Sequence, residues 1–249
     1  MVRPNSDTIY MRLLDLTLPT PAENLALDEA LLAAAEQSGA PDETLRFWES
    51  QQPIVVVGRS SRVAAEVHVD ACKNHGVPIF RRISGGSAIA AGPGCLMYAL
   101  VLSYELRPHF RSLDAAHRDV LGALCGALTA CSADVRRQGT SDLAIGSMKF
   151  SGNSVRCRRR HLLYHGTLLY NFALPKVAQC LRQPPREPNY RQSRSHEQFL
   201  TNIPATAAAL RRAIQRAWQA TVVRAAWPAE LTASLAGDKY GDPSWNLQH

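Results

Sequence analysis

One nearly continuous apolar run, LMYALVLS (Leu96–Ser103), constrains the fold of this chain more than any other feature. A strand of this composition, with no charged residue along its length, is typical of the inside of a sheet where both faces are covered. The run therefore predicts a buried strand, and a sheet whose faces are packed against other elements.

Periodic patterns on either side of this run mix strands with helices. Apolar residues recur at helical spacing from Ala22, and Gly39 supplies a stop, which predicts a helix there. Strands follow strands directly and helices are interspersed, so the predicted fold class is α+β, with mixed, largely antiparallel sheets flanked by helices. The other predicted helices are residues 69–75, 112–131, 173–182 and 205–220, and the other predicted strands are 45–49, 54–58, 77–82, 149–156 and 162–172.

Length and composition suit a soluble protein. The 249 residues, of which 46% are apolar, are enough for one large domain or two small ones, and no internal repeat is visible. The first 21 residues hold no apolar stretch long enough for a signal peptide. The apolar region 88–102 is broken by GPG and is too short for a membrane span. We therefore expect a cytoplasmic protein without a membrane partner.

Cysteine spacing indicates neither a zinc site nor a redox motif. No two of the six cysteines form a CxxC pair, and free thiols are the expected state in a cytosolic chain. Any of them is a potential nucleophile at this stage: Cys72, Cys95, Cys125, Cys131, Cys157 and Cys180.

The net charge of +7 favours an anionic partner, which can be a nucleotide, nucleic acid or an acidic protein. A basic nucleic-acid-binding module is the weakest of these alternatives. Aromatic residues make up only 7% of the chain, no recognition motif is present, and the arginines do not lie on one amphipathic helix.

The segment RRISGGSA (Arg81–Ala88) is the first candidate site. It lies between two predicted strands, and its adjacent glycines permit a tight turn whose backbone N–H groups can converge on an anion. Arg81 and Arg82 add positive charge suited to a carboxylate or phosphate. The alternative is a plain connecting turn with a solvated arginine pair. The segment is neither a Walker loop nor a GxGxxG loop.

The second candidate is SDLAIGSMKFSGNSVR (Ser141–Arg156). IGSM resembles a tight turn, so Lys149 begins the outgoing strand. A lysine held there can place a point charge on a phosphate or on charge that develops in a transition state. The alternative is an exposed lysine near a turn.

Together these segments resemble the lipoate–protein ligase A family of the biotin/lipoate ligase superfamily. NLALDEALL is similar to the family's early helix, and VVVGRSSRVAAEV to its strand and Gly-Arg turn. RRISGGSA resembles the family's RRxSGGGA loop. The series SDL, KFSGNSVR and YHGTLL resembles NDI, K[KV][IVF]SG[SN]A and HHGTLL. Order and approximate spacing agree over residues 22–172.

The resemblance implies a biotin/lipoate ligase (class II synthetase-like) catalytic domain over residues 1–249, with core motifs in 22–172 and a helical extension in 173–249. It implies that lipoate attacks the α-phosphate of ATP to give lipoyl-adenylate, and that a lysine of an acceptor protein then displaces AMP. Lys149 falls on the family's catalytic lysine. Magnesium would bridge the phosphates with few protein ligands, and Asp142 is the candidate metal or nucleotide contact. The other implied substrate- and adenylate-binding residues are Arg81, Arg82, Ser84, Gly85, Gly86, Ser87, Ser151, Gly152, Asn153, Arg156, His165, Gly166 and Thr167.

Two of these residues have a structural alternative. A histidine before Gly-Thr on an apolar strand is usually a satisfied structural residue, so we expect His165 to shape the pocket. We expect Gly166 to leave room for the acyl chain or the loop. The run RCRRRH (Arg156–His161) is predicted to be a solvated hairpin tip, apart from Arg156.

The sequence departs from the family in its glycine loop. The family continues GGGAVYHDLGN, whereas this chain has GGSAIAAGPGC, which leaves the choice of acyl group open. The part after YHGTLL is expected to hold a short helix, an Arg/Pro loop, a longer helix and a polar tail. The small C-terminal domain of the family is then dispensable, or supplied by a separate accessory polypeptide, or the protein only transfers an acyl group.

Whether the protein only transfers an acyl group depends on the positions of its cysteines. A transferase of this fold moves octanoyl or lipoyl between carriers through a thioester, and neither Cys95 nor Cys131 matches the family's cysteine positions. No local cation or histidine activates Cys95. A ligase is therefore the leading hypothesis. Its expected partner is an acidic acceptor such as a lipoyl domain or a glycine-cleavage H-like carrier.

Overall fold

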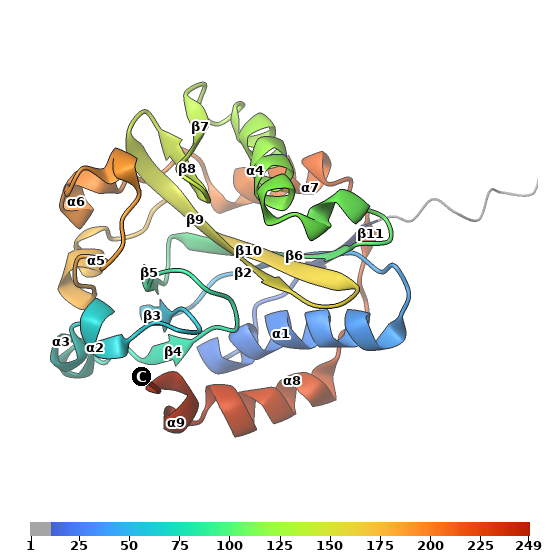
Figure 1. Cartoon of the computed structure of the whole chain (residues 1–249), viewed down its shortest axis with the longest axis horizontal. Helices are drawn as coiled ribbons and strands as arrows, with labels where there is room; N and C mark the ends of the chain where they lie inside the picture. Colours follow the sequence, from blue (N-terminus) through green and yellow to red (C-terminus); the bar gives the residue numbers. More distant parts are fainter. Residues whose placement is uncertain (1–10) are drawn as a thin grey trace, which may run out of the picture.

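The computed structural model describes residues 11–249, in which an eight-stranded sheet and a three-stranded sheet are flanked by helices (Figure 1). The large sheet has the order β11-β1-β2-β6-β10-β9-β8-β7. Its pairs are antiparallel except for β1 with β2 and β1 with β11, which confirms the predicted mixed, largely antiparallel class. The strands are β1 (Arg12–Asp15), β2 (Thr44–Trp48), β6 (Cys95–Ser103), β7 (Val135–Gln138), β8 (Asp142–Ile145), β9 (Met148–Cys157), β10 (His161–Leu169) and β11 (Val222–Val223).

Strand β6 is buried along its whole length, as its composition predicts. Alternate residues pack into two different cores: Met97 and Val101 belong to the core with α1 (Pro21–Ser38), whereas Leu96 and Leu100 belong to the core with α4 (Leu113–Leu128) and α7 (Ala207–Ala217). Figure 1 shows α4 and α7 on one side of the sheet and α1 on the other. The period-two alternation of a strand therefore places the central strand between two apolar layers.

Helix α1 begins and ends where the sequence predicts. Thr20 and Glu23 form a capping box at its start, and Gly39 ends it with a left-handed backbone (φ 69°). A buried ion pair fixes the helix on the sheet: the Arg46 guanidinium of β2 donates to the Asp28 carboxylate at 2.5 Å and to the Asn24 side chain at 2.7 Å.

The small sheet has the order β4-β3-β5 and carries the glycine loop. β3 (Ile54–Val57) pairs in parallel with β4 (Ile79–Arg81) and antiparallel with β5 (Ile89–Ala91). The predicted loop at residues 82–88 connects β4 to β5. Short helices α2 (Val63–Glu66), α3 (Val69–Asn74) and α5 (Pro175–Cys180) lie beside this sheet, and α6 (His196–Phe199) packs against α5 and β9.

The predicted hairpin of residues 149–156 and 162–172 is β9 and β10, with exposed arginines 158–160 at its tip. His161, which the sequence analysis included in the solvated tip, is instead buried at 1% exposure. It is the first residue of β10 and is paired with Ser103 of the central strand, so sheet formation takes it out of the loop.

The polar tail expected at the C-terminus is in fact helical and packed. It forms α8 (Ala229–Leu235), a π-helical turn (Ala236–Tyr240) and α9 (Pro243–Asn246), and α8 lies along α1 (Figure 1). Lys239 pairs with Glu29 of α1 at 2.8 Å, and the Tyr240 hydroxyl donates to the same carboxylate at 2.9 Å. Only a few apolar side chains make this contact, so the sequence there shows little periodicity.

Candidate active site

Lys149 lies at the start of β9, and its side chain folds back across Gly152. Its ammonium Nζ is 2.8 Å from Oδ1 of Asp142, which stands opposite Gly152 on the paired strand β8. A Cβ atom at Gly152 would come within 2.9 Å of this Nζ. The absence of a side chain at Gly152 therefore makes room for the lysine, which gives the glycine of KFSGNS a steric reason.

Asp142 lies between two donors. Its Oδ2 accepts a hydrogen bond from the Tyr190 hydroxyl at 2.8 Å, while Oδ1 faces Lys149. Residues 11–249 hold no group of three or more His, Cys, Asp or Glu side chains placed to bind a metal. The Mg²⁺ that the resemblance implies would use few protein ligands and would be held mainly by nucleotide phosphates.

Arg82 organises the glycine loop from inside. Its guanidinium donates to the carbonyls of Val56 at 3.1 Å and Ser87 at 3.0 Å, and also to the Gly85 carbonyl. Burial lowers the pKa of Arg82 to about 10, which leaves it charged at neutral pH. The positive φ of Gly86 (88°) lets the loop turn around this side chain.

The loop leaves several backbone donors available. The N–H of Ala88 donates to the Glu66 carboxylate at 2.5 Å, whereas those of Gly85, Gly86 and Ser87 have no partner among residues 11–249. These three residues are exposed. The arrangement suits an anion, as the sequence analysis predicts.

Arg81 does not belong to the site, contrary to the prediction. It is fully buried, and its guanidinium donates to the carbonyls of Gly58 (2.7 Å), Ser61 (2.9 Å), Arg59 (3.2 Å) and Trp245 (3.1 Å), and to that of Gln248. It lines neither of the two cavities described below. Its role is to join the turn after β3 to the C-terminal segment.

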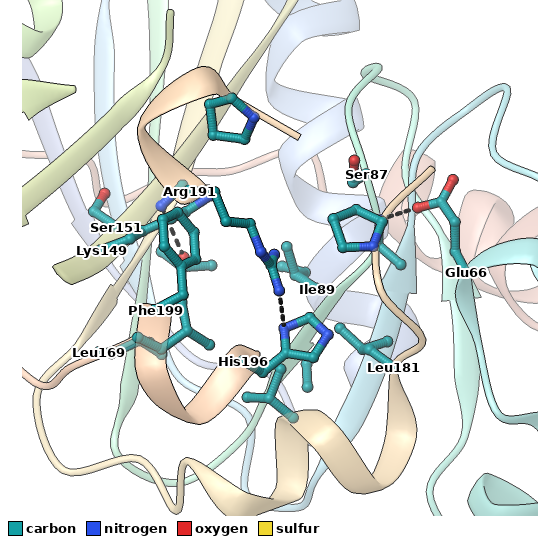
Figure 2. Close-up of a pocket in the computed structure, with 18 of the residues that line it drawn as sticks. Glu66, Ser87, Ile89, Lys149, Ser151, Leu169, Leu181, Arg191, His196 and Phe199 are labelled. Atoms are coloured by element: carbon teal, nitrogen blue, oxygen red, sulfur yellow. Dashed lines mark hydrogen bonds between the residues drawn. The ribbon is translucent and has the colours of Figure 1, made fainter. Parts of the chain in front are cut away.

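Two cavities share Lys149 as a wall. The larger, of about 390 Å³, extends from Lys149 to Leu25, Asp28, Val56 and Met97 beneath α1. The smaller, of about 130 Å³, lies toward α5 and α6; Figure 2 shows Leu181, Phe199 and His196 around it, with Glu66 and Ser87 at one side. Both cavities are also lined by Ser87, Ala88, Ile89, Gly152, Thr167, Arg186 and Pro188.

His165 forms part of the larger cavity's wall and is held at both ring nitrogens. Nε2 is 2.6 Å from the Ser84 hydroxyl, which also accepts from Arg82 Nε at 3.2 Å. Nδ1 is 3.8 Å from Oδ2 of Asp28. Burial raises the pKa of Asp28, but the charge of Arg46 and then the nearby His165 together outweigh burial, so that the pKa is lowered overall. A fixed His165 is consistent with the expected shaping role.

Gly166 lines the larger cavity and lies directly beside the Asn153 side chain. A Cβ at Gly166 would lie 1.9 Å from Oδ1 of Asn153, so that amide needs the space that the glycine leaves. Asn153 is fixed there because its Nδ2 donates to the Ser141 carbonyl at 2.8 Å and Tyr98 donates to its Oδ1.

The remaining predicted residues divide into two groups. Ser87, Ser151 and Thr167 line a cavity, as do Gly152 and Asn153. Arg156 lines neither cavity, and Ser84 is buried behind His165 at 1% exposure.

The sequence analysis missed several residues of the site. Asp28 and Leu25 lie in the quoted helix NLALDEALL, whose buried face could have pointed to them. Arg186, Pro188 and Tyr190 come from the Pro- and Arg-rich loop of residues 183–195, where no periodicity indicates which side chains face inward.

None of the six cysteines, all within the described residues, lines either cavity. Cys95 has no exposed surface, and burial together with the Glu49 carboxylate raises the pKa of its thiol to about 12. Its thiolate form is therefore scarce at neutral pH.

The fold is shared with solved lipoate–protein ligases. The family model described as "Lipoyl protein ligase A/B catalytic domain" matches residues 20–230, and the chain belongs to that family.

Two relatives show the range of activities in the family. A protein assigned as lipoate-protein ligase A in Aeropyrum pernix is 32% identical over 157 residues, which is 63% of this chain and 56% of that protein. The octanoyltransferase LipM of Symbiobacterium thermophilum is 27% identical over 95% of this chain and 98% of its own length. The chain spans about half the length of four ligase relatives that it matches, between 46% and 56% of each.

Solved structures agree on the fold. A bi-partite lipoate protein ligase from Thermoplasma acidophilum, described with its E2 lipoyl domain, superposes with a TM-score of 0.79 over 96% of both chains at 23% identity. A lipoate-protein ligase A bound with ATP gives 0.81 over 96% of this chain and 98% of its own, at 22% identity. Within residues 11–249 no helix combines the length and apolarity that crossing a membrane requires.

Proposed function

We propose that this chain is an ATP-dependent lipoate–protein ligase. It would activate lipoate as lipoyl-AMP and transfer the acyl group to one lysine of a lipoyl-acceptor protein. The observation that carries the proposal is the position of Lys149 between two cavities that no cysteine lines. Such a site offers charge stabilisation to a phosphoryl group but offers no thiol for a covalent intermediate.

In the first step a lipoate oxygen attacks the α-phosphorus of ATP, and the bond to pyrophosphate breaks. The Lys149 ammonium lies where it can neutralise the phosphoryl oxygens, and the free N–H groups of the glycine loop add further donors. Arg82 holds that loop in shape, so the donors are in place before the substrate binds.

In the second step the amine of the acceptor lysine attacks the acyl carbon, AMP leaves, and the amine loses a proton. The same Lys149 charge stabilises the departing phosphate. The inner end of the larger cavity, with Leu25, Val56 and Met97, supplies apolar surface for the acyl chain. The smaller cavity then accommodates part of the nucleotide.

The experiment that tests the proposal is incubation with ATP, Mg²⁺ and lipoate, followed by mass spectrometry. We expect lipoyl-AMP and pyrophosphate with the native chain and neither with Lys149→Ala. Acyl transfer from an acylated carrier without any adenylate would contradict the proposal.

A second candidate is an octanoyl or lipoyl transferase, because the LipM relative matches the chain over nearly its whole length. This route needs a thioester on cysteine. We expect Cys95→Ser and Cys131→Ser each to retain ATP-dependent transfer, with no acyl-thioester in the intact mass. A stable adduct that either serine variant abolishes would favour the transferase.

The proposed partner is an acidic acceptor domain, because the chain carries a net charge of +7. Steering between exposed charges is screened over about 8–10 Å near physiological ionic strength, so transfer should slow as salt rises. If transfer to a lipoyl domain were equally fast at low and high salt, steering by opposite charges would be ruled out. Whether a separate accessory polypeptide takes part can be tested by adding one to the same assay.

A further inference from the structure

The loop of residues 183–195, QPPREPNYRQSRS, contributes to the walls of both cavities. Pro188 and Tyr190 lie beside Gly139, where an added Cβ would meet them at 3.3 Å and 3.4 Å. Arg194 ties the loop to the β8–β9 turn by donating to the Ser147 carbonyl at 3.0 Å. Arg186 and Pro188 then line the larger cavity. The loop is therefore packed against the same hairpin that carries Lys149.

Within this loop, Tyr190 contacts Asp142, which is paired with Lys149. Its hydroxyl is 2.8 Å from Oδ2 of Asp142, whose other oxygen is 2.8 Å from Lys149 Nζ. Its ring is 5.1 Å from the Phe199 ring, which fixes the direction of the hydroxyl. Burial and then the Asp142 charge raise the pKa of Tyr190, so the hydroxyl remains a donor at neutral pH.

We infer that Tyr190 is a positioning residue, which acts through Asp142 to hold the Lys149 ammonium between the two cavities. A carboxylate bound at one oxygen can rotate, whereas donors on both oxygens fix its plane. The fixed carboxylate in turn restricts a lysine side chain that has four rotatable bonds, and Gly152 leaves the space in which it is held. This inference rests on the proposed function for its catalytic consequence.

The test is Tyr190→Phe, which keeps the ring and removes the hydroxyl. We expect the kcat for lipoyl-AMP formation to fall about tenfold, as is typical for losing one hydrogen bond to a charged group, with the KM for ATP within about twofold. The matched control is Tyr170→Phe, because the Tyr170 hydroxyl donates to Glu49 at 2.9 Å but Tyr170 lines neither cavity. We expect the control to retain the native kcat.

A double-variant cycle tests the route through Asp142. In an Asp142→Asn background, Tyr190→Phe should have much less than its tenfold effect, because the contact through which it acts is already changed. Equal effects in both backgrounds would overturn the role assigned to Asp142.

A second measurement does not depend on catalysis. The chain has four lysines, Lys73, Lys149, Lys176 and Lys239, so labelling with an amine-reactive reagent can be followed at each one by mass spectrometry. We expect Lys149 to be labelled severalfold faster in Tyr190→Phe, relative to Lys176, and at the native rate in Tyr170→Phe.

The two measurements separate the two proposals. Unchanged kcat and unchanged Lys149 labelling in Tyr190→Phe would overturn the inference, as would a raised KM at native kcat. A native chain that makes no lipoyl-AMP would contradict the proposed function, while the labelling would still decide whether Tyr190 holds Lys149.

Discussion

Arg81 and Arg82 are neighbours in the chain, and both are buried, yet they serve opposite sides of the glycine loop. Arg82 lines the larger cavity and binds the carbonyls of the loop, whereas Arg81 binds carbonyls of the turn after β3 and of the C-terminal segment. Arg81 is the last residue of β4, and successive side chains of an extended segment point to opposite faces. Backbone alternation thus accounts for a functional difference that residue type does not show.

The two sides also differ in which backbone groups remain without a hydrogen-bond partner. On the Arg81 side five carbonyls meet one guanidinium, which lines neither of the two cavities. On the Arg82 side the loop carbonyls are engaged while the N–H groups of Gly85, Gly86 and Ser87 stay available. The comparison separates residues that stabilise the fold from residues that offer binding groups. Substitutions on the Arg82 side should therefore mainly affect activity, whereas substitutions on the Arg81 side should mainly affect stability.

The largest loss of activity is expected from Lys149→Ala, on the Arg82 side of the loop, which we also call the cavity side. Loss of the charge that faces the phosphoryl group should cost about 3 kcal/mol of transition-state stabilisation or more, which lowers the adenylation rate at least about a hundredfold. Thermal unfolding should change little, because the lysine is partly exposed and contributes little packing. A native adenylation rate in this variant would contradict the assignment.

On the opposite side, Arg81→Met should mainly reduce stability. It removes a donor from two buried and three partly buried carbonyls, which we expect to lower the free energy of unfolding by about 3 kcal/mol. Denaturant unfolding measures this, with the exposed Arg159→Met as the control. Limited proteolysis should cut first within residues 229–249. If Arg81→Met kept its native stability but lost activity, Arg81 would belong with the binding groups and not with the residues that stabilise the fold.

Gly152→Ala sharpens the comparison because it adds one methyl group on the cavity side. The new Cβ would lie 2.9 Å from Lys149 Nζ, and the flexible lysine end can move more easily than the strand. We expect adenylation to fall about tenfold, with less than about 1 kcal/mol change in stability. Gly122→Ala in α4, where an added Cβ meets nothing within 4 Å, is the control. Equal adenylation rates in the two variants would argue against the steric reason for Gly152.

The smallest effect concerns pH and the wall of the smaller cavity. His196 lies against Arg191 (Figure 2), and its Nε2 is 3.0 Å from the Arg182 carbonyl, so Nε2 carries the proton and Nδ1 accepts from Arg191. Burial lowers the pKa of His196 from 6.5, although the Arg182 bond opposes this. Its stabilisation is thus complete above pH 6.5 and is lost as pH falls through the lowered pKa.

Unfolding midpoints between pH 8 and pH 5 test this expectation. The native chain should lose up to about 1 kcal/mol of stability on the acid side, and His196→Gln should flatten part of that loss. His117 also has a pKa lowered by burial, so some dependence should remain in the variant. An unchanged pH dependence in His196→Gln would show that His196 does not contribute.

Much of the fold could be predicted from local patterns. The apolar run of β6, the helical spacing and stop of α1, and the hairpin of β9 and β10 each depend on neighbours within one element. The position of Lys149 at the head of a strand beside a tight turn followed from the same patterns. The helices of residues 229–246 could not be predicted, because their contacts with Glu29 and Arg81 join residues more than 160 positions apart.

The sequence by itself determined most of the long helices and strands and where the two motif clusters lie, because periodicity and turn chemistry are local. Only the tertiary structure decided which side chains share the site. It turned Arg81 away from the cavity and Arg82 into the loop, and filled the space beside Gly166 with Asn153. It also brought Tyr190 onto Asp142 across 48 positions of the chain. Contacts of this range depend on how packed elements meet, and no local pattern of residues encodes that.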